Sequence, residues 1–326
     1  MILLSETDIR AVLTMPALID AMAEALGAFS DGRVNQPVRQ VLEVGPTRAY
    51  YGVMPAATDD PPALGAKLVT VFASNLARGL PSHMATIVLM DPDTGAPVAL
   101  LDGRYITEAR TAAVSAVSVR LLARADASVL AVLGSGVQAR SHVEAIRHVR
   151  PIREVRVWSR SAANREAFVR EVGETTGLVV RAEDAAAAAV ADAHVVVLAT
   201  ASHTPVLRSA DVAPGTHVVG VGACRPDQRE MPTALIQRAR VYVDSRAAAF
   251  QEAGDLILPV AEGAIDQGHV VGELGELVRG RVAGRLTADE VTLFKSLGMA
   301  VEDLTAAALV VSLAGARGIG LPWSPT

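Results

Sequence analysis

The sequence predicts an α/β protein of two domains, and three observations support this fold class. The chain has 326 residues, enough for two domains with buried cores. Hydrophobic residues make up 51% of it and aromatic residues only 3%, a composition that favours buried parallel strands. Short apolar strands alternate with helical segments from residue 129 onward, whereas the first ~110 residues contain strands without helices between them.

The first part of the chain predicts two helix starts followed by an antiparallel or mixed sheet. Ser5–Asp8 and Thr14–Pro16 have the composition of helix N-termini, and the second introduces a helix over Ala17–Phe29 that ends at Gly32. A Pro-, Asp- and Gly-containing turn at Asp91–Gly95 predicts a hairpin. Strands are expected at Val38–Val44, Ala49–Met54, Ala63–Phe72, Ala85–Met90 and Pro97–Asp102.

The segment Ser128–Ala139, SVLAVLGSGVQA, predicts a dinucleotide-binding turn. A buried strand over Val129–Leu133 leads into a glycine turn and then into a helix from Val137. In the pattern G-x-G-x-x-A, the first glycine permits the tight turn, the second permits close approach of a pyrophosphate, and the alanine permits close helix packing. The helix N-terminus adds free N–H groups and a partial positive charge. The predicted cofactor-binding residues of this turn are Gly134, Ser135, Gly136, Val137 and Gln138.

A regular β-α rhythm follows and indicates a Rossmann-type NAD(P)-binding domain at residues 113–305. A long helix over Ile106–Arg124 leads into it, and the alanine run at Asp184–Val190 is read as a plain helix. The tail Thr287–Gly315 is predicted to be helical and to return to the first domain, which then comprises 1–112 plus 306–326. Strands are expected at Val129–Leu133, Val155–Trp158, Leu178–Arg181, Val195–Thr200, His217–Val221 and Val241–Asp244.

The end of the second predicted strand favours NADP(H), with NAD(H) as the alternative. An NAD enzyme usually has a carboxylate here for the ribose hydroxyls. In this chain Glu154 stands at the opposite end of the strand. The strand is followed by an arginine with two serines, and these residues suit a 2′-phosphate. Thr200 and Gly222, where two further strands are expected to end, complete the cofactor set. The residues predicted for the 2′-phosphate are Ser159, Arg160, Ser161 and Asn164.

Charge and composition weigh against several other classes of protein. The net charge of −5 argues against nucleic acid as the main partner. No apolar run reaches the ~20 residues of a membrane helix, and MILLSETDIR lacks the basic region of a signal peptide. The single cysteine, Cys224, excludes an internal disulfide and suits a reducing cytoplasm. The seven histidines are scattered without metal-site spacing, so no metal is expected.

Nearly the whole chain resembles the ornithine cyclodeaminase/mu-crystallin family. The motifs that carry the resemblance are Gln36–Arg39, Gly52–Pro55, Lys67–Thr70, Leu80–His83, Arg110–Ala113, Gly134–Ala139 and Gln251–Asp255. The family includes cyclodeaminases, amino-acid dehydrogenases and ketimine reductases. It implies a homodimer whose first domains pair, so the first domain is expected to be a mixed α+β substrate-binding and dimerisation domain.

The resemblance also implies that Arg39, Lys67 and Arg110 line a substrate pocket. An arginine is a planar bidentate donor for an α-carboxylate, and Lys67 can donate a proton to a substrate nitrogen. Lys67 also stands out from the residues alone, because a lysine within the apolar strand ALGAKLVTVF needs a partner or a function. Further candidates are Ser82 and His83 for the substrate and Thr111 for the cofactor. Gly298–Ala300 and Asp303 either border the nicotinamide or form a helix–domain contact.

One segment departs from the cyclodeaminase branch of the family. That branch has an aspartate that orients the substrate amine, and Cys224 takes its place here. Asp227, three residues later, matches the R-P-D-x-R-E form of the reductase branch and is retained as a candidate catalytic residue. A neutral thiol cannot act as an amine-orienting base, so the expected activity is NADPH-dependent reduction of Δ1-pyrroline-2-carboxylate or Δ1-piperideine-2-carboxylate to proline or pipecolate. The alternatives are ornithine cyclodeaminase, an alanine or N-alkyl amino acid dehydrogenase, and a non-catalytic NADPH-binding protein.

Overall fold

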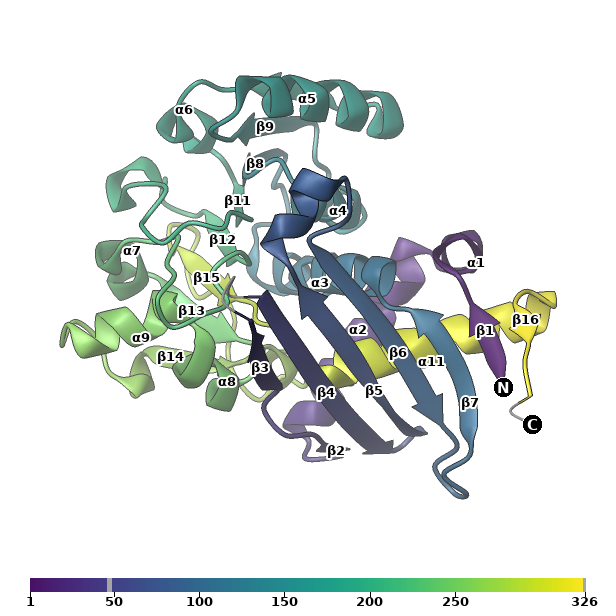
Figure 1. The fold of residues 1–326 in the computed structure, drawn as a ribbon. Helices are drawn as coiled ribbons and strands as arrows, with labels where there is room; N and C mark the ends of the chain where they lie inside the picture. The colour runs from purple at the N-terminus through teal and green to yellow at the C-terminus, as the bar shows by residue number, and fades with distance from the viewer. Residues whose placement is uncertain (46–48, 325–326) are drawn as a thin grey trace. The chain divides into compact units, whose positions relative to one another are not determined.

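The structure is a computed structural model that describes residues 1–45 and 49–324 and divides into two compact units (Figure 1). Unit 1 comprises Met1–Arg110 with Gly298–Thr326, and unit 2 comprises Thr111–Leu297. The predicted α/β class is confirmed, because unit 1 holds a mixed sheet and unit 2 a parallel one.

The sheet of unit 1 has the strand order β16-β1-β7-β6-β5-β4-β2, with β3 pairing to β4. Strand β1 runs parallel to β7, and the other neighbours are antiparallel. The sequence therefore correctly predicted a mixed sheet, although it did not predict β1, β2 or β16. The strands are β1 (Ile2–Leu4), β2 (Val34–Asn35), β3 (Gln40–Val44), β4 (Ala49–Asp59), β5 (Pro62–Val71), β6 (His83–Met90), β7 (Pro97–Asp102) and β16 (Leu321–Pro322).

Two long helices cover one face of this sheet (Figure 1). They are α2 (Met15–Ser30) and α11 (Ala300–Arg317), and the short α1 (Glu6–Val12) precedes α2 behind a Ser5 capping box. Helix α11 lies close over the sheet at Gly65, where a Cβ atom would overlap the Val88 carbonyl and lie 3.1 Å from Leu304. A 3-10 helix, η1 (Ala73–Arg78), follows β5, and α3 (Arg104–Leu122) begins in unit 1 and continues into unit 2.

The sheet of unit 2 is parallel, with the order β10-β9-β8-β11-β12-β15-β13-β14. Its central strands are fully buried, as expected for a sheet covered on both faces. The strands are β8 (Val129–Leu133), β9 (Glu154–Trp158), β10 (Val179–Ala182), β11 (Val195–Leu198), β12 (His217–Gly220), β13 (Arg240–Val243), β14 (Val270–Glu273) and β15 (Thr292–Lys295). The helices are α4 (Val137–Ile146), α5 (Ala162–Thr176), α6 (Ala186–Val190), α7 (Thr233–Arg238), α8 (Arg246–Glu252), α9 (Gly254–Ala261) and α10 (Leu274–Val278), with 3-10 turns η2 (Ser209–Asp211) and η3 (Gln267–His269).

The strand order of unit 2 reverses between β8 and β11. Strands β9 and β10 lie on one side of β8, and β11 and β12 lie on the other. In open α/β sheets such a switch point opens a crevice at the carboxyl ends of the strands, where a ligand binds. The predicted glycine turn follows β8 and therefore lies at this edge.

The prediction of a helical tail over Thr287–Gly315 is wrong in its first half. Residues Thr292–Lys295 form β15, which lies between β12 and β13 and is fully buried. Helix α11 begins only at Ala300. The run VTLF is short and apolar, and periodicity cannot distinguish a buried strand of this length from a segment of buried helix.

No single helix among the described residues is long and apolar enough to cross a membrane. The consecutive helices α1 and α2 are long and apolar enough only when taken together, and the chain bends by 93° between them.

Candidate functional site

Lys67 occupies a buried position on β5. It lies opposite Met54 of β4 and Ile87 of β6, so its side chain follows the buried face of the sheet. Its Nζ is 2.6 Å from Oδ2 of Asp303, and the two side chains are 2% and 1% exposed. The lysine that stood out in the sequence therefore has a carboxylate partner on α11.

Arg110 joins the same group from the first half of α3. Its Nε donates to Oδ1 of Asp303 at 3.0 Å, and its Nη1 donates to Oε2 of Glu302 at 2.6 Å. Both carboxylates lie in the first turn of α11, where the helix dipole favours negative charge. All of these side chains are almost fully buried, so the charges interact in a medium of low dielectric constant.

Arg39 reaches the group through the chain segment before α11. Its Nη2 donates to the carbonyl of Gly298 at 3.3 Å. Gly298 has φ +83°, and a Cβ atom there would overlap the guanidinium of Arg110. The Gln36 side chain accepts a hydrogen bond from Val301 N at 2.8 Å, which joins the Arg39 segment to the start of α11. We call Arg39, Lys67, Arg110, Glu302 and Asp303 the ionic cluster of unit 1.

Burial and charge set the ionisation of this cluster. Burial lowers the pKa of Lys67 to about 8, Asp303 opposes that effect, and Arg110 and Arg39 reinforce it. For Asp303, burial would raise the pKa, but Arg110 and Lys67 outweigh it and hold the pKa below its ordinary value. Burial, with Lys67 and Arg110, lowers the pKa of His83 to about 4, so His83 is neutral at pH 7. Lys67 therefore holds a proton at pH 7 and can release it readily.

The ionic cluster brings three cationic side chains together. They are Arg39, Lys67 and Arg110, and the carboxylates of Glu302 and Asp303 lie among them. Cationic side chains gathered in this way favour a negatively charged ligand. A guanidinium binds a carboxylate by two parallel hydrogen bonds.

Three other predicted residues, Ser82, Thr111 and Asp227, have different surroundings. Ser82 precedes β6, and its carbonyl accepts from Phe72 N at 2.7 Å. Thr111 is buried in α3, where its carbonyl accepts from Ser115 Oγ at 3.0 Å. Asp227 is a surface residue of unit 2, with its side chain 60% exposed and 3.7 Å from His203. Their proposed roles stay predictions.

The glycine turn of unit 2 has the geometry that a dinucleotide requires. Gly134 has φ +123°, and a Cβ atom there would overlap the carbonyl of Ala199, so only glycine fits. Open space surrounds the Cβ position of Gly136, which is the N-cap of α4. Among the described residues no side chain caps this helix, so its first N–H groups suit a phosphate.

The predicted adenosine end lies beside this turn. Ser135 Oγ donates to Ser159 Oγ at 2.9 Å, and Gly134 N donates to the Trp158 carbonyl at 2.8 Å. Ser161 caps α5 by accepting from Asn164 N at 3.2 Å. These contacts bring the turn after β8 and the end of β9 together, so the residues present fit a dinucleotide.

Thr200 and Gly222 also come together, through a residue that the sequence analysis did not identify. The buried carboxylate of Glu230 accepts from the backbone N–H groups of both residues, at 2.6 Å and 2.7 Å. The structure thus connects the ends of β11 and β12.

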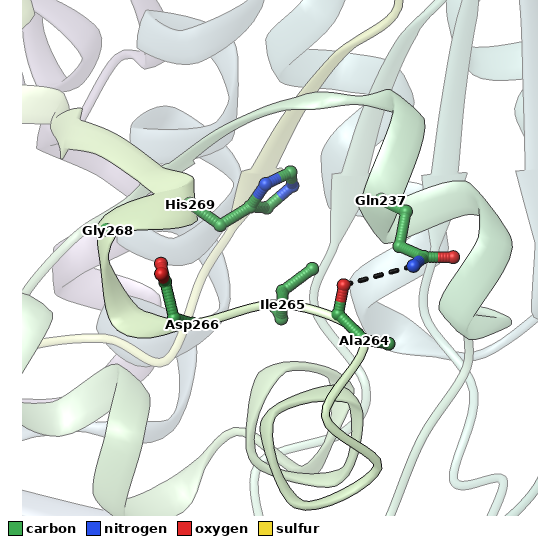
Figure 2. Close-up of a pocket in the computed structure, with 6 residues that line it drawn as sticks. All are labelled: Gln237, Ala264, Ile265, Asp266, Gly268 and His269. Atoms are coloured by element: carbon green, nitrogen blue, oxygen red, sulfur yellow. Dashed lines mark hydrogen bonds between the residues drawn. The ribbon is translucent and has the colours of Figure 1, made fainter.

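A separate cavity of about 450 Å³ lies on unit 2 (Figure 2). It is open to solvent beside α7 and η3, and the Gln237 amide donates to the carbonyl of Ala264 at its edge at 3.0 Å. None of the predicted site residues lines it. The lining residues are Gln237, Ala264, Ile265, Asp266, Gly268 and His269.

Sequence reasoning missed the carboxylates of both sites. Glu302 and Glu230 were not singled out, and Asp303 was considered only as a border of the nicotinamide or as part of a helix–domain contact. The available signal was local: the acidic pair Glu302-Asp303 interrupts the apolar run from Leu297 to Ala308. Buried charges of this kind need partners, and the argument applied to Lys67 applies equally to them.

The fold and these sites define a class, the NAD(P)-dependent oxidoreductases of two domains. More particularly, the chain belongs to the ornithine cyclodeaminase/mu-crystallin family, whose sequence pattern matches residues 1–316. The resemblance seen in the sequence is therefore confirmed.

Relatives with assigned activities cover nearly the whole chain. It is 43% identical over 296 residues to ketimine reductase mu-crystallin of Mus musculus, covering 90% of each chain. It is 36% identical over 321 residues to a Δ1-pyrroline-2-carboxylate reductase of Bacillus cereus, covering 98% of each.

Solved structures of the same fold carry ligands. The Thermococcus litoralis Δ1-pyrroline-2-carboxylate reductase in complex with NADH and L-proline matches with a TM-score of 0.97 and 35% identity, covering 99% of this chain and 100% of that one. An archaeal alanine dehydrogenase dimer with bound NAD matches with a TM-score of 0.94 and 29% identity, covering 100% and 99%.

Proposed function

We propose that this chain is an NADPH-dependent reductase of cyclic imines that carry an α-carboxylate, forming proline from Δ1-pyrroline-2-carboxylate or pipecolate from Δ1-piperideine-2-carboxylate. The observation that carries the proposal is the ionic cluster of unit 1, which brings two arginines together with a buried lysine whose pKa is lowered to about 8. The assigned activities of the mouse and Bacillus cereus relatives support the same reaction.

Each residue of the ionic cluster has a defined task in this proposal. Arg110 and Arg39 bind the substrate carboxylate, and Asp303 and Glu302 hold Arg110 in orientation. A nicotinamide cofactor, when bound, would supply the hydride that the α-carbon needs. Lys67 supplies the proton that the ring nitrogen needs, directly or through water, so that the C=N bond becomes a CH–NH bond.

Turnover assays test the proposed reaction. Purified protein is mixed with NADPH and each cyclic imine, and the absorbance of NADPH is followed together with the products. We expect NADPH oxidation that depends on the imine and forms proline or pipecolate. Formation of proline and ammonia from L-ornithine, without net change of cofactor, would instead identify a cyclodeaminase.

The structure gives the cyclodeaminase alternative little support. Cys224 lies where that branch has its aspartate, and its thiol is half-buried with Sγ 3.2 Å from the Val221 carbonyl. Asp227, the possible substitute, has an exposed side chain near His203. Neither residue provides a buried carboxylate to orient an amine.

The preference for NADPH rests on Arg160. This arginine is exposed at the turn after β9, and α5 begins two residues later, so a cation and a helix N-terminus are both available there for a 2′-phosphate. We expect Arg160→Glu to raise the KM for NADPH at least about tenfold, because one charge-assisted hydrogen bond contributes about 1.5–3 kcal/mol. The KM for NADH should change far less. Initial rates with both cofactors measure this.

Arg170→Glu, at an exposed position on α5, is the control for the change of charge. If Arg160→Glu raises the KM for both cofactors equally, or for neither, the 2′-phosphate assignment is wrong and NAD(H) becomes the proposed cofactor, as found in the solved relatives.

We further propose that the chain forms a homodimer through the sheet of unit 1. Helices α2 and α11 cover one face of this sheet (Figure 1), and the other face exposes Leu42, Leu68, Met84 and Leu100 by 36–61%. The strand registers place these four side chains on one face. An apolar sheet face of this kind indicates an interface, and the archaeal alanine dehydrogenase is a dimer. A monomeric mass by light scattering would contradict the proposal.

A further inference from the structure

A buried carboxylate connects two neighbouring strand ends in unit 2. Glu230 is fully buried. Its Oε1 accepts from Thr200 N at 2.6 Å and from Thr200 Oγ1 at 2.7 Å. Its Oε2 accepts from Gly222 N at 2.7 Å and from Ala223 N at 3.2 Å. Four donors from two loops therefore converge on one side chain.

The two loops lie at the edge of the sheet where a dinucleotide is expected. Thr200 follows the end of β11, and Gly222 follows the end of β12, the next strand in the sheet. The loops are in direct contact, because a Cβ atom on Gly222 would overlap the carbonyl of Thr200. Neither loop can shift toward the other, and the carboxylate of Glu230 prevents them from separating.

Glu230 is itself held by further buried charges. The backbone N–H groups of Glu230 and Met231 donate to Oδ1 of Asp255 at 2.8 Å and 3.0 Å. Lys295, at the end of β15, lies 3.6 Å from Oδ2 of Asp255 and donates to the carbonyl of Gly220 at 3.3 Å. Burial raises the pKa of Glu230, and Lys295 opposes that rise.

Stability alone does not account for such a group. Burying several charges costs solvation free energy, and apolar side chains of the same volume often stabilise a core as well or better. What a carboxylate provides and an apolar side chain does not is a fixed direction for the N–H groups of Thr200, Gly222 and Ala223. The arrangement therefore orients loops rather than filling space.

We infer that Glu230 is a positioning residue for the nicotinamide half of the cofactor, an inference that rests on the proposed function. A doubly wound sheet binds each half of a dinucleotide on one side of its switch point. The glycine turn and the end of β9 take the adenosine half, which leaves the ends of β11 and β12 for the other half. Glu230 acts there by holding the Thr200 and Gly222 loops.

Binding measurements with whole and partial cofactors test this role. NADPH and NADH are titrated into wild-type protein and Glu230→Gln, with 2′,5′-ADP and AMP as probes of the adenosine half. The amide of glutamine presents one acceptor and one donor to N–H groups that need two acceptors. We expect the Kd of the whole cofactors to rise at least about tenfold, because hydrogen bonds to a charged group are lost. The Kd of the fragments should stay within about twofold.

The controls separate positioning from general damage. Glu174→Gln, at an exposed position on α5, should leave every Kd unchanged. Equal weakening of whole cofactors and fragments, or no weakening, would overturn the inference. Wild-type protein that binds NADPH but reduces no imine would contradict the proposed function and not this role.

A second variant covers the case in which Glu230→Gln does not fold. Thr200→Val removes only the hydroxyl that donates to Glu230 and should raise the Kd of the whole cofactors about threefold, whereas Thr200→Ser should not. Where the double variant folds, its Kd for the whole cofactors should equal that of Glu230→Gln alone. Additive effects would mean that Thr200 acts independently of Glu230, against the inference.

Discussion

Replacing Lys67 by methionine is expected to lower kcat/KM for a cyclic imine about 10³-fold. A positioned general acid contributes about 10²–10⁴-fold to a rate, and methionine has no proton to donate. Steady-state assays with NADPH and Δ1-pyrroline-2-carboxylate measure the loss. Lys67→Arg keeps the positive charge but cannot release a proton near pH 7, so it should be nearly as slow. Retention of more than a tenth of the activity by either variant would exclude Lys67 as the proton donor.

The same substitution should also destabilise the fold, and this effect must be separated from catalysis. Loss of Lys67 removes one of the cations that pair with the buried Asp303, and the ion pair with Arg110 remains. Breaking one side of a buried ion pair costs about 3–5 kcal/mol, and less where another cation remains. The double variant Lys67→Met with Asp303→Asn also removes the carboxylate that has lost its lysine partner. We expect it to recover most of the stability in urea unfolding while staying as inactive as Lys67→Met.

The pH profile gives an independent test of the same role. Burial lowers the pKa of Lys67 to about 8, and Asp303 opposes that effect. A general acid is active in its protonated form, so kcat/KM should fall as the pH rises through about 8. In Asp303→Asn the pKa of Lys67 should fall further, and the alkaline limb should move to lower pH by about one unit or more. An unmoved limb would show that another group controls it.

Local signals were sufficient where turn residues bound a strand. The strand Val129–Leu133 was predicted with its observed bounds, because its apolar run ends at a glycine turn. Gly134 in that turn has φ +123°, which favours glycine. The strand Pro97–Asp102 of unit 1 was likewise bounded by turn residues. The strand Thr292–Lys295 lacked such limits on its N-terminal side, and its burial depends on strands β12 and β13, which come from distant parts of the chain.

The sequence predicted the cationic residues of the site but not its carboxylates. Lys67 stood out because a charge in an apolar strand is locally anomalous, and the family resemblance supplied Arg39 and Arg110. That Asp303 pairs with both Lys67 and Arg110 depends on how α11 lies on the sheet. No local pattern encodes a contact between residues so far apart in the chain. Glu230 escaped notice for the same reason, since its partners are backbone N–H groups.

Two buried histidines should make the protein sensitive to acid. His142 bonds Ser115 Oγ and the Gln138 carbonyl, and His217 bonds Ser118 and Thr292, all within unit 2. Burial lowers the pKa of His142 to about 4 and that of His217 to about 3. In the unfolded chain both titrate near 6.5, so below that pH the unfolded state binds more protons than the folded state. Stability is therefore full above about pH 6.5 and falls as the pH is lowered toward the folded pKa values.

We expect the free energy of unfolding to fall by on the order of 4 kcal/mol between about pH 6.5 and pH 4.5 through these two groups, since each pKa unit corresponds to about 1.4 kcal/mol. Urea unfolding at a series of pH values measures the slope. The single substitutions His142→Gln and His217→Gln remove one titrating group each. Each should therefore reduce the fall in unfolding free energy between about pH 6.5 and pH 4.5 by about half, whatever its effect on stability at pH 7. His148→Gln, whose ring lies at the surface beside Glu144, is the control for loss of a histidine as such. A slope that neither buried substitution changes would show that carboxylates, and not these histidines, govern acid unfolding.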